Sequence, residues 1–348
     1  MSFNVHVRPS GHEFSVADDE TILDAALRHG ITLPYGCRDG VCGACKSRLI
    51  EGDVDYGMFE PRALSGAEMA AGYTLLCQSR PLSDVIIEVS EISDAEQISI
   101  MKLPCRVTKL EQLSSDVTRV YLKLPPSERL QFLAGQYIDF LLRDGRRRSF
   151  SIANAPHDDE VIELHIKRIE GGRFTDDAFA ELKEKAVLRL EGPFGDFYLR
   201  EDSPRPIIFV AGGTGFAPIK SILDHAFAQG VTRPLHFYWG VRSRRDLYLD
   251  TLPRAWAEQY PHFRYTPVLS EPLPEDEWRG AQGYVTAVVL RDHPALNAFD
   301  VYASGPPVLV QAAHRDFIAH GLAPENFYAD PFEFTPDTAA EDCSGVTK

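Results

Sequence analysis

The sequence has 348 residues, of which 44% are hydrophobic and 25% charged, and its formal net charge is −15. This length predicts two or three domains with an ample core, and the composition is that of an ordinary soluble protein. The negative charge argues against nucleic acid as a partner, and no apolar run approaches the ~18 residues that a membrane span needs.

Residues 1–92 predict a small module made of strands, one helix and a cysteine loop. The elements expected there are a hairpin over 2–9 and 12–16, a helix from Thr21 to about Arg28, and strands over 46–50 and 84–89. Residues 1–97 hold 16 acidic and 7 basic side chains, a net charge of −9. Two interpretations stay open: general solubility, or an acidic face that steers a basic redox partner.

Cysteine spacing is the most informative pattern in this region. Four residues lie between Cys37 and Cys42, and two lie between Cys42 and Cys45. The fourth thiol, Cys77, comes later in the chain. This is the plant-type ligand spacing of a 2Fe-2S cluster. The alternatives are a pair of disulfides or a four-thiolate zinc site, but zinc ligands normally come in two short pairs. We therefore predict that the four cysteines hold the iron of a cluster.

Glycines in the same loop support a cluster. Gly36, Gly40 and Gly43 can take the positive φ angles that a loop around a cluster requires, and they let backbone N–H groups approach the sulfurs. Two further cysteines remain, Cys105 and Cys343, which we interpret as a structural thiol and a tail thiol. The first residues lack the basic and apolar regions of a secretory signal. We expect a cytoplasmic protein, because clustered cysteines in a reducing compartment more often bind metal than form disulfides.

The rest of the chain predicts two larger domains. Residues 93–103 are polar and lack a strong pattern, so we expect a linker there. Residues 104–200 predict an antiparallel β-barrel, with strands over 105–113, 117–124, 137–142, 148–153 and 161–167. Residues 201–335 predict a parallel α/β domain, with strands over 207–211, 235–239, 265–269 and 301–303 and a helix over 218–229. Residues 336–348 are small and polar, and we expect a disordered tail.

A tetrapeptide on one barrel strand, Arg148-Ser149-Phe150-Ser151, precedes a glycine-rich stretch, Gly171-Gly172-Arg173-Phe174-Thr175. An aromatic residue on a strand is usually core and an arginine there usually makes a salt bridge, so the tetrapeptide alone is a weak signal. The two glycines open a predicted helix, and the N–H groups of a helix N-terminus can hold a phosphate. A tight turn is expected at 192–195, where the sequence is Gly-Pro-Phe-Gly.

A second glycine-rich turn, Gly212-Gly213-Thr214-Gly215, lies between a predicted buried strand and a helix that contains Pro218. It matches neither the Gly-x-Gly-x-x-Gly fingerprint nor a P-loop. Glycines at this position still let the backbone approach a pyrophosphate. A plain glycine turn is the alternative. Arg242 follows a later strand, and Ser304-Gly305-Pro306 ends another.

Taken in order, these motifs resemble known redox modules. Residues 1–92 are similar to a plant-type ferredoxin, a β-grasp fold. The next two regions resemble the flavin and nicotinamide domains of the ferredoxin–NADP reductase superfamily, whose flavin signature is Arg-x-Tyr-Ser. The resemblance implies a multidomain α+β and α/β protein that comprises a β-grasp ferredoxin, an antiparallel β-barrel flavin domain and a parallel α/β nicotinamide domain.

The resemblance implies roles for the flavin motif. Arg148 would clamp the flavin phosphates, Phe150 would pack on the isoalloxazine in place of the family tyrosine, and Ser151 would bond near N5. Ser149 belongs to the same signature. Residues 171–175 would hold the pyrophosphate, through Thr175 and the N–H groups near Gly172. FAD is expected rather than FMN.

For nicotinamide, the resemblance implies a binding set, and it implies a catalytic set of Ser151, Ser304 and Phe334. The binding set is Gly212, Gly213, Thr214, Gly215, Pro218, Arg242, Gly305 and Pro306. Ser304 takes the place of the family cysteine beside the nicotinamide ring, and Phe332 or Phe334 would shield the flavin. Glu271 would repel a 2′-phosphate, which favours NADH. Arg244 and Arg245 favour NADPH, which stays the alternative.

The arrangement resembles reductases that feed Rieske or di-iron oxygenases, and also CDP-6-deoxy-glucoseen reductase. It implies an oxidoreductase in which electrons pass from NADH to FAD, then to the 2Fe-2S cluster, and finally to a partner protein. We expect that partner to be a multicomponent oxygenase. The alternatives are a sugar dehydratase, or a stand-alone reductase of free flavin, ferric chelates or cobalamin. We expect a monomer that binds neither nucleic acid nor membrane.

Overall fold

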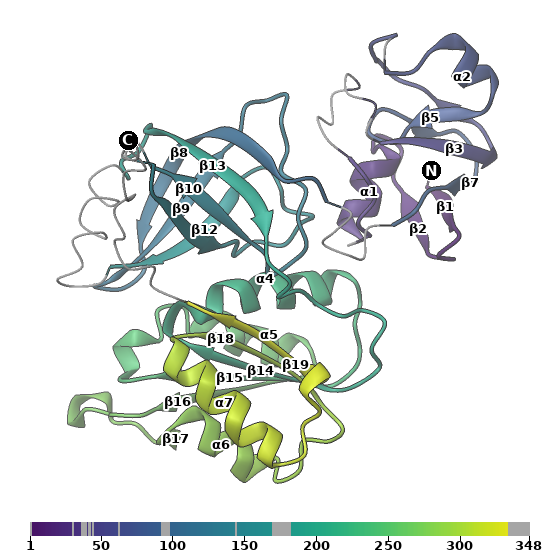
Figure 1. Ribbon diagram of the computed structural model, residues 1–348. Helices are drawn as coiled ribbons and strands as arrows, with labels where there is room; N and C mark the ends of the chain where they lie inside the picture. The colour runs from purple at the N-terminus through teal and green to yellow at the C-terminus, as the bar shows by residue number, and fades with distance from the viewer. Residues whose placement is uncertain are drawn as a thin grey trace, which may run out of the picture.

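The computed structural model describes residues 2–29, 31–35, 40, 43, 45–61, 63–91, 98–142, 145–168 and 182–332. Three modules are visible in Figure 1: an N-terminal module (2–91), a barrel module (98–200) and a sheet module (201–332). The N-terminal module lies beside the barrel, and the barrel lies over the sheet module with helix α4 (Phe216–Ala228) at their boundary (Figure 1).

The N-terminal module is a five-stranded mixed sheet in the order β2-β1-β7-β3-β5, with helix α1 packed on it. Thr21 caps α1 as predicted, because its side chain accepts a hydrogen bond from the Asp24 N–H at 3.1 Å. The elements are β1 (Phe3–Arg8), β2 (Glu13–Val16), α1 (Ile22–Arg28), β3 (Lys46–Glu51), β4 (Val54–Asp55), α2 (Gly66–Ala70), β5 (Tyr73–Leu75), β6 (Arg80–Pro81) and β7 (Val85–Glu88).

The barrel module is a six-stranded antiparallel sheet in the order β11-β10-β13-β8-β9-β12. A bridge between Ile152 and Leu164 joins its two outer strands and closes the sheet. The strands are β8 (Met101–Gln112), β9 (Val117–Lys123), β10 (Tyr137–Leu141), β11 (Arg147–Ser151), β12 (Ile162–Lys167) and β13 (Val187–Phe194).

The sheet module has six parallel strands in the order β17-β16-β15-β14-β18-β19. Helices α4 and α5 cover one face through Phe216 and Trp256, and α6 and α7 cover the other through Val289 and Phe317. Besides α4, its elements are β14 (Ile207–Gly212), η2 (Gly213–Gly215), β15 (Leu235–Val241), η3 (Arg244–Asp246), α5 (Thr251–Gln259), β16 (Phe263–Leu269), η4 (Pro274–Asp276), β17 (Ala281–Gln282), α6 (Val285–Asp292), β18 (Asp300–Gly305), α7 (Pro307–Ala319), η5 (Pro324–Asn326) and β19 (Phe327–Pro331).

Two local expectations differ from the structure. The turn expected at 192–195 is instead the end of strand β13, which continues to Phe194. Pro193 fits there because the β10–β13 register shifts at this point, so the missing N–H breaks no ladder bond. Strand β8 begins at Met101, inside the stretch expected to be a linker, because Met101 pairs with Gly192.

Some expectations lie outside the described residues, namely the helix after Thr175 and the tail over 336–348. Within the described part of the chain, no helix combines the length and apolar character needed to cross a membrane.

Candidate functional site

Two of the four predicted iron ligands belong to the described residues, and they lie together. Cys45 and Cys77 are 3% and 5% exposed. Their chain segments are joined by a hydrogen bond from the Leu76 N–H to the Cys45 carbonyl. The hydrogen bond between the two thiols, opposed by burial and helped by the Gly40 N–H, lowers the pKa of Cys77 to about 7. Cys37 and Cys42 lie outside the described residues.

The loop glycines behave as a cluster loop requires. Gly40 and Gly43 have φ angles of +72° and +77°, and a Cβ on Gly40 would lie 2.8 Å from the Met58 carbonyl oxygen. Two buried thiols that contact each other, one of them with a lowered pKa and a backbone N–H directed at its sulfur, are the donor set that iron takes. The described residues therefore fit a 2Fe-2S cluster, and Gly36 lies outside them.

Strand β11 presents the predicted flavin residues on two faces. Arg148 and Phe150 are two residues apart, so their side chains share one face of the strand. Phe150 is half-buried against Phe140, with ring centroids 5.5 Å apart. Ser149 faces the other way and donates to Asp139 Oδ1 at 2.7 Å. The glycine-rich stretch 171–175 lies outside the described residues, so the structure does not place it.

The two predicted catalytic serines meet on one carboxylate. Ser151 Oγ at the end of β11 donates to Asp330 Oδ2 at 3.3 Å, and Ser304 Oγ on β18 donates to the same oxygen at 3.2 Å. The first serine belongs to the barrel module and the second to the sheet module. Burial raises the pKa of Asp330 to about 6, although both serine hydroxyls oppose that shift. The third predicted residue of this set, Phe334, lies outside the described residues.

Asp330 is the site residue that the sequence interpretation missed. It lies on β19, paired with Ser304 across the β18–β19 ladder. The sequence feature that could have identified it is a single carboxylate inside the strand-like stretch Phe327–Pro331, close to Phe332 and Phe334.

The predicted glycine turn lies at the carboxyl end of β14, in contact with the end of β18. A Cβ on Gly215 would lie 2.2 Å from the Ser304 carbonyl oxygen, and one on Gly305 would lie 2.6 Å from the Gly212 carbonyl oxygen. By contrast, Gly213 has a φ of +52° and open space where its Cβ would be. This is a backbone cradle at the start of α4, where a pyrophosphate can approach the N–H groups.

The neighbours of this cradle extend along the same sheet edge. A Cβ on Gly212 would lie 2.7 Å from Pro306 Cδ, so the two loops are packed closely. Thr214 and Pro218 are buried, at the turn and in the first part of α4. Farther along, the Glu271 N–H donates to the Arg242 carbonyl at 2.9 Å, and both side chains are exposed. The backbone of Arg244 is held by Asp276.

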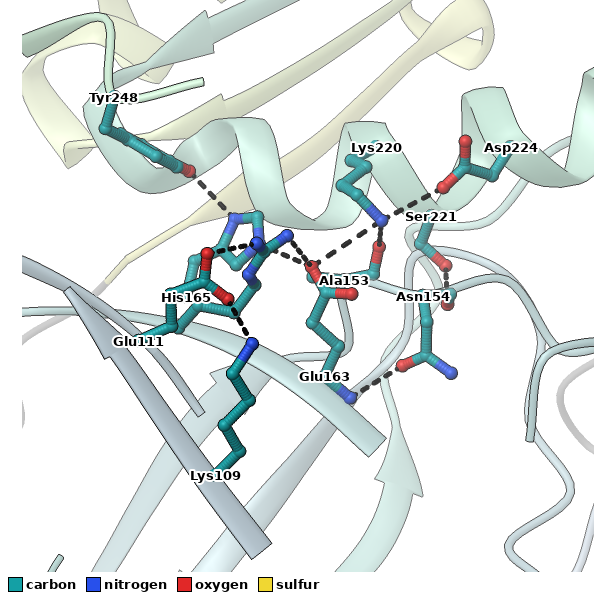
Figure 2. Close-up of polar contacts among 11 residues, drawn as sticks. Lys109, Glu111, Ala153, Asn154, Glu163, His165, Lys220, Ser221, Asp224 and Tyr248 are labelled. Carbon is teal, nitrogen blue, oxygen red and sulfur yellow. Dashed lines mark hydrogen bonds and ion pairs between the residues drawn. The ribbon is translucent and has the colours of Figure 1, made fainter. Parts of the chain in front are cut away.

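A buried polar network joins the barrel to α4 (Figure 2). Lys220 Nζ donates to the Ala153 carbonyl at 3.0 Å, lies 3.0 Å from Asp224 Oδ2 and lies 3.6 Å from Glu163 Oε1. Ser221 Oγ donates to the Asn154 carbonyl at 2.7 Å. Because Ala153 follows Ser151 closely in the chain, the network fixes the barrel serine opposite the sheet module.

The network continues into the sheet module through a histidine. His165 Nε2 donates to Glu163 Oε1 at 2.8 Å, and Tyr248 Oη donates to His165 Nδ1 at 3.0 Å. Burial lowers the pKa of His165, which favours the neutral ring, and the Glu163 carboxylate can only accept a hydrogen bond, which assigns the proton to Nε2. Burial by itself would raise the pKa of the Glu163 carboxyl. The His165 hydrogen bond and the Lys220 charge outweigh burial and lower this pKa to about 2.

Comparison with known proteins gives three family matches in chain order. Residues 5–82 match the 2Fe-2S iron-sulfur cluster binding domain, residues 104–198 the oxidoreductase FAD-binding domain, and residues 209–315 the oxidoreductase NAD-binding domain. These spans coincide with the three modules.

Similar proteins match along nearly the whole chain. The CDP-6-deoxy-L-threo-D-glycero-4-hexulose-3-dehydrase reductase of Yersinia pestis is 42% identical over 332 residues, which cover 95% of this chain and 99% of the relative. Reductase component 1 of the Comamonas sp. terephthalate 1,2-dioxygenase is 36% identical over 339 residues, with coverages of 97% and 99%. The crystal structure of an Amycolatopsis cytochrome P450 reductase is 33% identical, with a TM-score of 0.63 and coverages of 95% and 98%.

Proposed function

The chain belongs to the iron–sulfur flavoprotein reductases of the ferredoxin–NADP reductase superfamily, and we propose that its electron acceptor is a dehydrase of a CDP-linked deoxyhexulose. The observation that carries this choice is the 42% identity to two Yersinia reductases of such a dehydrase, against 36% for the terephthalate dioxygenase reductases. All of these relatives are covered over 99% of their length.

The chain is an NADH-dependent electron-transfer reductase with FAD and a 2Fe-2S cluster. For each NADH oxidised to NAD⁺, the cofactors when bound release one proton and deliver two electrons, one at a time, to the acceptor. The protein's own residues bind these groups, orient them and hold charge near the reacting atoms.

We assign the flavin site to β11 and the serine pair. Arg148 would hold the flavin phosphates with its forked guanidinium, and Phe150 would pack on the ring system. Residues 171–175 complete this assignment as the pyrophosphate-binding stretch. Ser151 and Ser304 stand on either side of Asp330, so this carboxyl would fix both hydroxyls where the hydride passes.

We assign the nicotinamide site to the glycine turn 212–215 and to the end of β18. The open space at Gly213 supports a pyrophosphate on the α4 N-terminus. Glu271, exposed beside Arg242 at the strand ends, supports NADH as the substrate because a carboxylate there repels a 2′-phosphate. We place the limits of the first and last modules at 1–92 and 201–335, begin the barrel module with strand β8 at Met101, and place the cluster on Cys37, Cys42, Cys45 and Cys77.

A reconstitution experiment tests the acceptor. The assay mixes purified holoprotein and NADH with the Yersinia CDP-6-deoxyhexulose dehydrase and its sugar nucleotide. We expect coupled NADH oxidation only when the holoprotein, the dehydrase and the sugar nucleotide are all present. Changing Cys77 to Ser removes one cluster ligand, so this coupled activity should be lost while NADH-to-ferricyanide turnover through the flavin continues. The proposal would be contradicted if none of the sugar-nucleotide dehydrases tested supported NADH oxidation.

An oxygenase is the second candidate acceptor. It is supported by the 36% identity to the dioxygenase reductases and by the likeness to the P450 reductase structure. In the same assay, NADH oxidation that depends on an oxygenase component and consumes oxygen would select this acceptor over the dehydrase.

A further inference from the structure

We propose that Tyr35, Gln131 and Asp159 form a docking joint that holds the cluster loop against the barrel module and so sets the rate at which electrons pass from flavin to cluster. The inference rests on the proposed function, since it requires that electrons take this route. It concerns three side chains that neither the cluster ligands nor the flavin motif includes.

The joint fixes the three residues that lead into the cluster loop. Tyr35 Oη donates to Asp159 Oδ2 at 2.8 Å. The side-chain amide of Gln131 donates to the Leu33 carbonyl at 2.8 Å and accepts from the Tyr35 N–H at 3.5 Å. Gln131 therefore pairs with the backbone of 33–35 as a neighbouring strand would. Cys37 follows Tyr35 by two residues, so the joint holds the chain that enters the ligand loop.

Burial makes the tyrosine contact strong and selective. Tyr35 is 5% exposed and Asp159 is 6% exposed, and the Arg129 guanidinium lies 4.0 Å from the same carboxylate oxygen. A hydrogen bond to a charged acceptor that is shielded from water is stronger than a neutral one at the surface. Loss of the phenol hydroxyl leaves a buried carboxylate with one donor fewer, which is the costly kind of change.

On the barrel side, Asp159 of the joint lies on the loop that follows strand β11, which carries the flavin motif. Asp159 belongs to the segment between β11 and β12, whose backbone Asn154 ties together through the Asp158 and Val161 carbonyls. The same segment is held by α4 through Ser221 (Figure 2). One loop thus begins at Ser151, contacts the sheet module and binds the N-terminal module.

The joint is small enough for single substitutions to matter. Every hydrogen bond that the structure shows between described residues of the N-terminal and barrel modules runs through it. Losing any of these bonds weakens the contact between the modules, and a contact of this kind is an equilibrium between docked and undocked forms. Electrons cross efficiently only in the docked form, so the transfer rate follows the docked population.

Rapid mixing of anaerobic holoprotein with NADH separates the steps. The flavin absorbance reports reduction by NADH, and freeze-quenched EPR reports reduction of the cluster. We expect Tyr35→Phe to slow cluster reduction about fivefold and the double variant Tyr35→Phe/Gln131→Met at least about tenfold, because the first loses one of the three hydrogen bonds and the second loses all three. NADH-to-ferricyanide turnover, iron content and the EPR line shape should stay as in the wild type.

The matched control is Tyr73→Phe, which removes a phenol hydroxyl from an exposed side chain on strand β5 of the same module and should change no step. If Tyr35→Phe loses iron, Gln131→Met alone tests the joint from the barrel side. Hydrogen exchange gives a readout independent of turnover: the amides of 33–35 should exchange faster in the double variant.

Two results would overturn the proposal. In one, cluster reduction in the double variant keeps the wild-type rate although the amides of 33–35 exchange faster. In the other, exchange of those amides is unchanged, which means that the joint does not form in solution. A wild-type protein whose flavin is reduced by NADH but whose cluster stays oxidised would refute the proposed function instead.

Discussion

Asp330 is the residue with the clearest pH signature. Burial raises the pKa of its carboxyl from an ordinary value of 3.8 to about 6. Because the native pKa lies above the unfolded one, this group stabilises the fold at low pH, and that contribution is lost as pH rises through about 6. Above that pH the native protein holds a buried negative charge between two serine hydroxyls.

We therefore predict that Asp330→Asn raises the free energy of unfolding at pH 8. A change of the carboxyl pKa from 3.8 to about 6 corresponds to about 3 kcal/mol, and the amide can still accept from both serines. Denaturant titrations between pH 4 and 8 measure the effect. Asp202→Asn, which changes an exposed aspartate of the same module, is the control and should leave the curve unaltered. Equal gains for both variants at every pH would contradict the assignment.

Single residues were predictable where a local pattern carried the chemistry. Ser151 and Ser304 were predicted from motifs near the ends of two strands, and the structure brings both hydroxyls to Asp330, while their catalytic roles stay predictions. The two glycines described in the cluster loop were predicted from their spacing among cysteines. Asp330 was not predicted, because its place in the site depends on the β18–β19 register and on its contact with the barrel. No local sequence pattern contains either of these.

Helix α4 and strand β12 share the network that determines how well the barrel is held on the sheet module (Figure 2). Lys220 is 8% exposed and lies between two carboxylates, Glu163 and Asp224. Burial opposes its charge, yet those carboxylates raise the pKa of the lysine. Removing one partner from a buried charged group leaves the others uncompensated, and this costs more than the pair contributes.

We predict that Lys220→Met lowers the free energy of unfolding by about 3 kcal/mol, and that adding Asp224→Leu recovers part of the loss. Lys109→Met is the matched control, because Lys109 pairs with Glu111 at 3.0 Å while its side chain is 59% exposed. A surface pair of that kind contributes about 0–1 kcal/mol. Guanidinium titrations followed by tryptophan fluorescence measure both. Equal midpoints for the two lysine variants would show that the network does not stabilise the fold.

Elements with a strong period were predictable, and those defined by partners were not. Strands β14, β15 and β18 are buried apolar runs, and α1 has a capping threonine, so all four were anticipated. Strand β13 was not predicted, because its first three residues are not buried and because Pro193 lies near its end. The network in Figure 2 was not predicted either, since Glu163 and Lys220 are far apart in sequence and each has the character of an ordinary surface residue.

At the scale of the whole molecule, charge is unevenly distributed, with −9 of the net −15 carried by residues 1–97. Salt screens the attraction between exposed charges, and the screening length falls from ~30 Å to ~3 Å between ~0.01 M and ~1 M salt. If the acidic module meets the acceptor protein, kcat/KM for that acceptor should fall roughly tenfold over this range. The measurement is coupled NADH oxidation at varied acceptor concentration.

Flavin reduction at saturating NADH is the internal control, because it involves no encounter with a protein partner. It should vary much less with salt than the acceptor-dependent rate does. If kcat/KM for the acceptor did not change with salt concentration, solubility would remain as the role of the acidic side chains.

The segment that leads into the cluster loop has a consequence for protein engineering. Among the described residues, the N-terminal module binds the barrel through the Leu33 carbonyl and through the N–H and hydroxyl of Tyr35. A chimaera that carries a foreign iron–sulfur module would therefore need to keep a tyrosine two positions before the first ligand. Exchange of such modules among reductases would then be constrained at this phenol.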